Sequence, residues 1–270
     1  MALETELLEL GVRPGDVVMV HASLRKLGLA RSQGVEDGAG RLFDALETAV
    51  GRTGTLLMVL GTEYPMDSVN LKPVEERAAL LAGTAPFDFV SAPVLPEVGW
   101  AAEAFRRRAG TLTSSNPSGK FGARGARAAE LLEDQPWNDY YGPGSPLEKL
   151  CAWGGRILRL GSDAETVTAL HYAEYVAQVP EKKKTRWDYV LAGRGHVFIE
   201  CLDDANGIVD WEGDDYFALI TRAYLKLGRH REGQVGAARA ELVEAADLVQ
   251  FGARWMEEHF LPLQKTAPSR

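Results

Sequence analysis

The stretch DVVMVHAS, residues 16–23, decides the fold that this sequence predicts. Four consecutive apolar residues that follow a Pro-Gly turn are typical of a buried strand. The segment 38–54 has the apolar spacing of a helix and ends in glycine, and TLLMVLG at 55–61 is a second apolar strand. Strand, helix and strand in this order predict a parallel strand pair with a right-handed crossover.

The rest of the chain continues in the same manner, with helical and strand-like stretches between turn residues. Further helices are expected at 3–16 (stopped by Gly11 and Pro14), 96–110, 126–134, 145–154, 166–179, 214–228 and at the end of 234–260. A strand is expected at 155–161, a hairpin at 185–204 turning at Gly193–Gly195, and a strand-like start at 234. Segments 62–96 and 111–125 are expected to be irregular. We therefore predict one α/β domain over 1–264, with a mixed central sheet flanked by helices, and a disordered tail at 265–270.

Composition excludes several classes of protein. A net charge of −8 argues against a nucleic-acid-binding protein, since such proteins need clustered excess Lys and Arg. The two cysteines, Cys151 and Cys201, have no metal-binding or redox spacing, and no metal site is expected. The N-terminal stretch lacks the features of a signal peptide, and no apolar run is long enough to span a membrane. A cytoplasmic protein is the expectation.

The stretch TVTALHYAEYVA, residues 166–177, places His171 and Glu174 three residues apart. On a helix these two side chains would share a face. A histidine beside a carboxylate is suited to proton transfer near neutral pH. A histidine in such a helix can equally be a packing residue, so the sequence alone leaves both readings open.

Two polar stretches could hold a ligand. His21, Ser23 and Arg25 follow the first strand, where ligands of α/β sheets bind, although an ordinary strand-to-loop exit has the same composition. The loop at 111–125 carries hydroxyl groups and two cations, which suit phosphate oxygens, but it lacks the order of a P-loop.

The segment ECLDDANGIVDWEGDD, residues 200–215, holds seven acidic residues and no Lys, Arg or His. A solvated loop is the ordinary explanation of such a run. Its spacing does not match a calcium loop. A site for a polycationic ligand is the third reading, with Trp211 or Tyr64 offering an aromatic face. Asp214 and Asp215, which precede a predicted helix, are expected to favour its N-terminal dipole instead.

These stretches together resemble the aminoglycoside 3-N-acetyltransferase family. The similarity covers nearly the whole chain in the family's order: 10–28, 49–65, FDF at 87–89, 99–125, YGPGSPLEKL at 141–150, 155–161, TVTALHYAEYVA at 166–177, LDDANGIVDW at 202–211, 224–228 and 245–260. Two positions depart from the family pattern. Asn116 stands before Pro117 where the family commonly has His-Pro, and Phe89 stands where it has Pro.

The resemblance implies an acetyl-coenzyme A-dependent enzyme with an antibiotic N-acetyltransferase fold, distinct from GNAT acetyltransferases. It implies transfer of acetyl to the 3-amino group of an aminoglycoside, which would be the cationic partner. The transfer would be direct, in a ternary complex, and would confer antibiotic resistance. His171 would be the general base. We expect its carboxylate partner to be Glu174 or an acid between Asp203 and Asp210.

The site residues that follow from this reading fall into two groups besides the catalytic pair. The residues expected to bind the coenzyme are His21, Ser23, Leu24, Arg25, Thr113, Ser114, Ser115 and Lys120. The residues expected to bind the acceptor are Tyr64, Asp67, Asp88, Asp203, Asp204, Asn206 and Asp210. A monomer or a homodimer is expected. Two alternatives stay open: the same chemistry on another small amine, and a non-catalytic sugar- or polyamine-binding protein.

Overall fold

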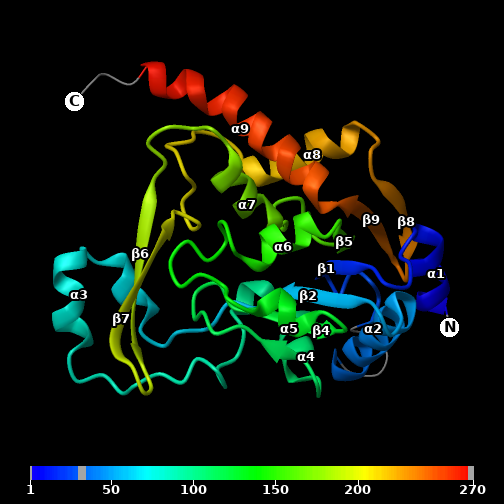
Figure 1. The fold of residues 1–270 in the computed structure, drawn as a ribbon, viewed down its shortest axis with the longest axis horizontal. Helices are drawn as coiled ribbons and strands as arrows, with labels where there is room; N and C mark the ends of the chain where they lie inside the picture. The colour runs from blue at the N-terminus through cyan, green and yellow to red at the C-terminus, as the bar shows by residue number, and fades with distance from the viewer. Residues whose placement is uncertain (1, 30–34, 267–270) are drawn as a thin grey trace.

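A mixed seven-stranded sheet forms the centre of the computed structural model, which describes residues 2–29 and 35–266 (Figure 1). In spatial order its strands are β3 (Leu112–Thr113), β4 (Phe121–Gly125), β2 (Thr55–Val59), β1 (Val17–Ala22), β5 (Arg156–Leu160), β9 (Ala238–Glu244) and β8 (Arg231–Val235). The three central strands β2, β1 and β5 are parallel. The outer strands are antiparallel to their neighbours. The predicted single α/β domain with a mixed sheet is confirmed.

The two faces of the sheet are covered by different helices because alternate strand residues point to opposite sides. Val18 and Val20 pack in a core with α1 (Ala2–Leu10), α2 (Val35–Val50) and α4 (Trp100–Arg107). Val17 and Met19 pack in the other core, which α5, α6, α7, α8 and α9 complete. These helices span Ala128–Leu132, Pro146–Ala152, Ala169–Val176, Tyr216–Lys226 and Ala245–Thr266.

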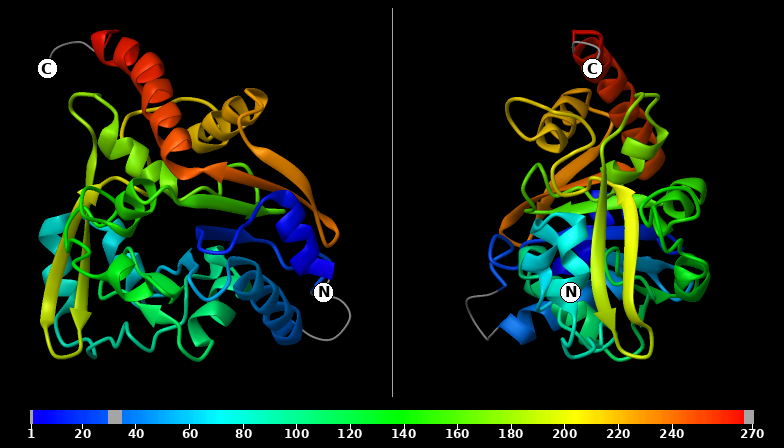
Figure 2. Two further views of the ribbon diagram at one scale, coloured as in Figure 1. Left: turned by 45° about the vertical axis from the view of Figure 1, so that its right-hand side comes forward. Right: turned by 90° about the vertical axis from the view of Figure 1, so that its left-hand side faces the viewer.

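The predicted hairpin at 185–204 forms a separate two-stranded sheet of β6 (Lys184–Leu191) and β7 (Gly195–Leu202). It stands at one end of the molecule, with α3 (Val74–Leu81) beside it (Figures 1 and 2). The buried carboxylate of Asp188 on β6 fixes this arrangement, because it pairs with Arg77 of α3 at 3.2 Å and with Arg186 of β6 at 2.9 Å. The hairpin therefore extends the core of the sheet domain rather than forming a second one.

Two segments expected to be irregular are partly regular. The segment 62–96 contains α3 and the short helix η1 (Asp67–Leu71), and another short helix, η2 (Pro96–Val98), begins at its end. The segment 111–125 contributes β3 and β4 to the sheet edge. Short strands at a sheet edge escaped prediction because glycine and serine hide their periodicity, whereas pairing with β2 supplies their hydrogen bonds.

The C-terminal helix α9 runs to Thr266, so residues 265 and 266 of the predicted tail are helical. The remainder of that tail, 267–270, lies outside the described residues. No helix in the described part of the chain is both long and apolar enough to cross a membrane.

Candidate active site

A cleft of about 700 Å³ opens at the carboxyl ends of the three parallel strands. Residues 20–25 line it from the end of β1 and the loop that follows, residues 58 and 59 from β2, and Ser162 and Asp163 from the loop after β5. The other walls are residues 97–101 and the start of α7, including His171. Ligands bind at this edge of α/β sheets because the loops that follow parallel strands meet there. The cleft brings the His21 loop and His171 together across 150 positions of sequence.

His171 and Glu174 form a hydrogen-bonded pair on α7. Nδ1 of His171 lies 2.9 Å from Oε2 of Glu174, and Glu174 is almost completely buried. The imidazole ring stacks on Tyr141 with centroids 4.8 Å apart and meets the edge of Phe217. Because a carboxylate accepts, Nδ1 carries the proton and Nε2 of the neutral ring keeps its lone pair. The hydrogen bond to Glu174 and the ring contacts with Tyr141 and Phe217 together fix the orientation of the imidazole ring.

A third group completes the pair from another helix. The hydroxyl of Tyr216, the first residue of α8, donates to Oε1 of Glu174. Asp215 caps α8 by accepting from the backbone N–H of Ala218 at 2.9 Å, which confirms the helix-terminal role expected of this acid. Gly207 lies so close to the Tyr216 ring that a Cβ atom there would be 2.8 Å from it. The position of the Tyr216 ring is therefore fixed by the start of α8, to which it belongs, and by the turn at Gly207, against which it packs.

The surroundings of His171 favour its protonated form. Burial by itself lowers the pKa of His171, but the hydrogen bond and the charge of Glu174 outweigh burial, so that the pKa is raised above the ordinary value of 6.5. The charges of Asp204 and Asp215 act in the same direction. An imidazole with a raised pKa is a stronger base, and it is matched to removing a proton from an ammonium group near neutral pH.

The loop after β1 forms the opposite wall of the cleft. His21 is buried, and its Nε2 has no hydrogen-bond partner in the described part of the chain. Burial, together with the charge of Arg159, lowers the pKa of His21 to about 3, so this ring is neutral. Ser23 and Leu24 also line the cleft, and Arg25 is exposed at its mouth. Four residues predicted to bind a coenzyme are therefore brought together with His171.

A family model described as aminoglycoside 3-N-acetyltransferase matches residues 19–257 of this chain. The chain belongs to the aminoglycoside 3-N-acetyltransferase family. It is 36% identical to aminoglycoside N(3)-acetyltransferase III of Serratia marcescens over 266 residues, which are 96% of this chain and 97% of the relative. The predicted family and the prediction of an acetyltransferase enzyme are confirmed.

Two solved structures of the family share this fold. The structure of AAC-IIIb binary with CoASH has a TM-score of 0.84 and 34% identity, and covers 95% of each chain. The structure of AAC-VIa bound to sisomicin has a TM-score of 0.81 and 36% identity, and covers 95% of this chain and 96% of that one.

The second loop that the resemblance assigned to the coenzyme does not contribute to the lining of the cleft. Thr113 is part of β3, and Ser114 is buried, with its hydroxyl accepting from the N–H of Phe121 at 3.0 Å. Ser115 is exposed. None of the three is among the residues that line the cleft. The structure places this loop at the edge of the sheet, and its assignment to the coenzyme stays a prediction.

Lys120, predicted to contact a phosphate, is fully buried. Its ammonium donates to the carbonyl oxygens of Phe89 at 2.6 Å and Val90 at 3.0 Å. Burial lowers the pKa of Lys120 to about 8. This side chain anchors the segment 89–90 to the sheet, and it does not reach the cleft.

The two departures from the family pattern lie in this same region. Oδ1 of Asn116 accepts from the backbone N–H groups of Ser118 and Gly119, while its Nδ2 donates to the carbonyls of Pro136 and Trp137. Phe89 is buried beside Lys120. Asn116 connects its own turn to the segment at 136–137, and Phe89 packs beside Lys120. Neither residue lines the cleft.

The candidate acceptor residues are dispersed. Tyr64 is buried, and its hydroxyl accepts from the N–H of Val190. Asp67 and Asp88 are exposed, and Asp88 accepts from Val90 and Ser91 of its own turn. None of these three residues lines the cleft.

The acidic stretch separates into residues with different roles. Asp203 is buried and accepts from the N–H groups of Ala205 and Asn206, so it closes its own turn. Asp210 is almost fully exposed and pairs with Lys183 at 3.0 Å. Asp204 accepts from the hydroxyl of Tyr140, and its charge reaches His171. Among the acids predicted to bind the acceptor, Asp204 is the one whose charge acts on His171.

Sequence reasoning missed several residues around the pair. Tyr141, Phe217 and Tyr216 contact His171 or Glu174, and Glu97, Asp163 and Glu165 add carboxylates to the cleft. No periodic pattern marks them, because they come from several elements that are far apart in the sequence. Among the described residues, no group of three His, Cys, Asp or Glu side chains is arranged to hold a metal ion.

Proposed function

We propose that this protein transfers acetyl from acetyl-coenzyme A to the 3-amino group of the deoxystreptamine ring of aminoglycosides. The observation that carries the proposal is the His171–Glu174 pair, which opens into the same cleft as the His21 loop. Family membership supports the reaction type. A relative bound to coenzyme A and another bound to sisomicin support the two ligand classes.

His171 acts as the general base in this proposal. At neutral pH the acceptor amine is largely protonated, and only its free-base form attacks a thioester. Nε2 of His171 accepts the proton because Nδ1 is committed to Glu174. The imidazolium that forms is stabilised by the buried carboxylate of Glu174, with which it makes an ion pair.

The chemical step then exchanges one bond for another. The amine nitrogen bonds to the thioester carbonyl carbon, and the carbon–sulfur bond breaks after a tetrahedral intermediate. The nitrogen loses its second proton as the amide forms, and the thiolate of coenzyme A gains a proton. The products are the acetylated amine and the thiol, and the proton that His171 took from the ammonium group is released to solvent. The backbone N–H groups of the His21 loop are the nearest candidates to stabilise the developing oxyanion, since the loop lines the cleft opposite His171.

The two substrates enter on different sides of His171 in this proposal. The coenzyme lies along residues 21–25, with Arg25 as the phosphate contact at the mouth, because guanidinium groups bind phosphate oxygens strongly. The cationic acceptor approaches from the side of Asp204, whose charge is felt at the histidine. Direct transfer requires both ligands to be bound at once, and the shared cleft supports such a ternary complex.

A thiol-release assay with acetyl-coenzyme A and a panel of aminoglycosides and unrelated amines tests the proposal. We expect thiol release with deoxystreptamine-containing aminoglycosides, and nuclear magnetic resonance should locate the acetyl group on the 3-amino nitrogen. Release with other amines alone would identify an acetyltransferase of a different substrate class. Ligand binding without thiol release would instead favour a binding protein.

A further inference from the structure

Three polar side chains form a row across the sheet, on the face that α7 covers. His21 on β1 is in register with Arg159 on β5, and Arg159 is in register with Glu241 on β9. Met19 and Ile157, two positions earlier on β1 and β5, belong to the core that includes α7, so the row faces the same side. The three residues are only 4%, 3% and 7% exposed. Polar groups buried in this way are costly unless partners satisfy them.

Pairing within the protein satisfies only part of this row. Arg159 lies 3.4 Å from Glu241 and donates to the carbonyl oxygens of Ser162 and Asp163. In the described part of the chain, however, Nε of Arg159 and Nε2 of His21 have no hydrogen-bond partner, and neither has the hydroxyl of Ser162. Native proteins leave few buried polar atoms unpaired, and a catalytic role is one reason for such an atom. The carboxyl ends of β1 and β5 therefore keep hydrogen-bonding groups that the fold does not use.

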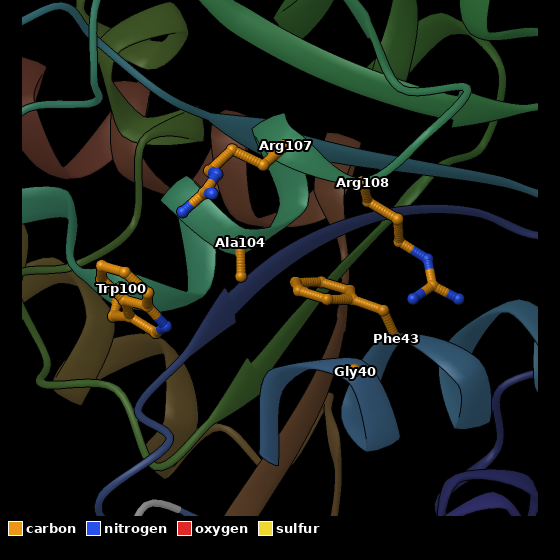
Figure 3. Close-up of a pocket in the computed structure, with 6 residues that line it drawn as sticks. All are labelled: Gly40, Phe43, Trp100, Ala104, Arg107 and Arg108. Atoms are coloured by element: carbon orange, nitrogen blue, oxygen red, sulfur yellow. The ribbon is translucent and has the colours of Figure 1, made fainter. Parts of the chain in front are cut away.

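A second hollow of the molecule lacks this property. It has a volume of about 270 Å³ and lies between α2 and α4, with Phe43 and Arg108 among its lining residues (Figure 3). Arg108 is paired there with two carboxylates of α2. Among the described residues, none that lines this hollow carries a buried polar atom without a partner. Of the two spaces, the cleft is the one with unused hydrogen-bonding groups, because His21 and Ser162 line it.

The surroundings of His21 make its ring a hydrogen-bond donor and a poor base. Burial first, and then the charge of Arg159, lowers the pKa of His21 to about 3, so the neutral ring carries a single N–H. A neutral imidazole can donate to a carbonyl oxygen and polarise it without giving up its proton. His171 lines the same cleft and has the opposite character, since its pKa is raised. Two histidines with such different surroundings suit two different tasks.

We propose that His21 donates a hydrogen bond from Nδ1 to the carbonyl oxygen of the acetyl thioester and stabilises the oxyanion that forms there. Nδ1 is the nitrogen chosen because the protein encloses Nε2. This inference rests on the proposed function, because it assumes that the thioester lies in the cleft with His21 and His171. When the amine nitrogen bonds to the carbonyl carbon, an electron pair moves to the oxygen, and it returns as the carbon–sulfur bond breaks. The proton on Nδ1 stays on the ring throughout.

Binding of the acetyl donor alone tests this inference without any acceptor. Acetyl-coenzyme A with an isotopic label at its carbonyl carbon is bound to the parent protein and to His21→Leu, which fills the position without a donor. A hydrogen bond weakens the carbonyl double bond, so infrared difference spectra should show a lower stretching frequency in the parent. With an aminoglycoside present, His21→Leu should lower kcat by roughly 10²- to 10³-fold, the range for loss of one oxyanion donor. The KM for acetyl-coenzyme A should change much less.

Two amide side chains show which ring nitrogen donates. The amide of Asn can place an N–H group near the position of Nδ1, whereas the longer side chain of Gln places it near that of Nε2. His21→Asn should therefore keep the low carbonyl frequency and a kcat within roughly tenfold of the parent. His21→Gln should resemble His21→Leu. Rescue by Gln instead of Asn would overturn the assignment of Nδ1.

Two further variants serve as controls. His230→Leu is the matched one, because the His230 side chain is only 6% exposed, its Nδ1 has no partner in the described part of the chain, and it lies outside the cleft. It should change neither the carbonyl frequency nor kcat. His171→Ala should lower kcat and keep the low frequency, since the base acts on the amine and His21 on the thioester.

The outcomes separate this inference from the proposed function. Equal carbonyl frequencies in the parent and in His21→Leu, both saturated with donor, would overturn the inference. A His21→Leu protein that keeps its turnover and loses thermal stability would do the same, because His21 would then be a structural residue. Thiol release with other amines alone would replace the proposed acceptor and leave the role of His21 standing. A parent protein that binds no acetyl-coenzyme A would refute the proposed function, and the inference with it.

Discussion

Glu174 joins two helices through its two carboxylate oxygens, since one lies 2.9 Å from Nδ1 of His171 on α7 and the other accepts from Tyr216 on α8. The carboxylate is buried, and burial raises its pKa, while the hydrogen bonds from both partners lower it. A buried carboxylate with donors on both sides is fixed in one orientation. The histidine therefore presents Nε2 to the cleft in a constant position.

Replacing His171 with Ala should lower kcat by roughly 10²- to 10⁴-fold, the usual contribution of a general base. The affinity for coenzyme A should change little, because the role of the ring is chemical. The thermal midpoint should fall, because the buried carboxylate of Glu174 loses a hydrogen-bond partner. Turnover with acetyl-coenzyme A and an aminoglycoside, measured beside circular dichroism, tests this. Near-normal turnover in a folded variant would make His171 a packing residue.

The pH profile of kcat/KM should show an acid limb with an apparent pKa above 6.5. A general base works in its unprotonated form, so activity falls as the pH drops through the pKa of the free enzyme's His171, which its surroundings raise. Steady-state rates between pH 5 and pH 9 would give this value, once the ionisation of the acceptor amine is measured separately. An acid limb below 6.5, or one that persists in the His171→Ala protein, would contradict the assignment.

Replacing Tyr216 with Phe should lower kcat by roughly tenfold and move the acid limb to higher pH. The lost hydroxyl stabilises the Glu174 carboxylate. Its removal destabilises the unprotonated pair more than the protonated pair, in which the imidazolium still compensates the charge. The pair then binds a proton more readily, so the measured pKa rises.

Tyr224→Phe is the control for this prediction. It removes a hydroxyl from the same helix that donates to a carboxylate, that of Asp247, at 2.8 Å and without contact to the pair. Both variants should lose some stability, but the control should keep the pH profile of the parent. A Tyr216→Phe protein with an unshifted acid limb would reduce Tyr216 to a purely structural residue.

Asp204→Asn should lower the pKa of His171, because the charge of Asp204 raises it, and the acid limb should move to lower pH. It should also raise the KM for the aminoglycoside more than that for acetyl-coenzyme A. Asp210→Asn is the comparison, since this almost fully exposed carboxylate pairs with Lys183, and exposed pairs contribute about 0–1 kcal/mol. Equal effects of the two variants would show that the acidic stretch acts only through its total charge.

Lys120→Met should reduce the free energy of unfolding by about 1–3 kcal/mol, because two buried carbonyl groups lose their donor. The KM for acetyl-coenzyme A should stay within twofold of the parent, since the side chain lies outside the cleft. Chemical denaturation and steady-state kinetics measure the two quantities. A large rise in this KM with unchanged stability would restore the phosphate contact that the sequence suggested.

Local features of the sequence determined much of what could be predicted. The apolar run before His21, the helix after it and the strand at 55–61 specified a parallel β–α–β unit, because side-chain periodicity within one element reflects which faces are buried. The spacing of His171 and Glu174 predicted that they share a helix face, and the structure then selected Glu174 among the candidate carboxylate partners. Asp215 was assigned to a helix terminus for the same local reason.

Tertiary structure decided the rest, because contacts between distant segments depend on how whole elements pack. Adjacent acids Asp203 and Asp204 look alike in sequence, yet one closes its own turn and the other accepts from Tyr140. Lys120 looked like a loop cation, but pairing of β4 with β2 carries it into the core. Tyr216 reaches Glu174 only because α7 and α8 both pack against α9, and no pattern within either segment encodes that meeting.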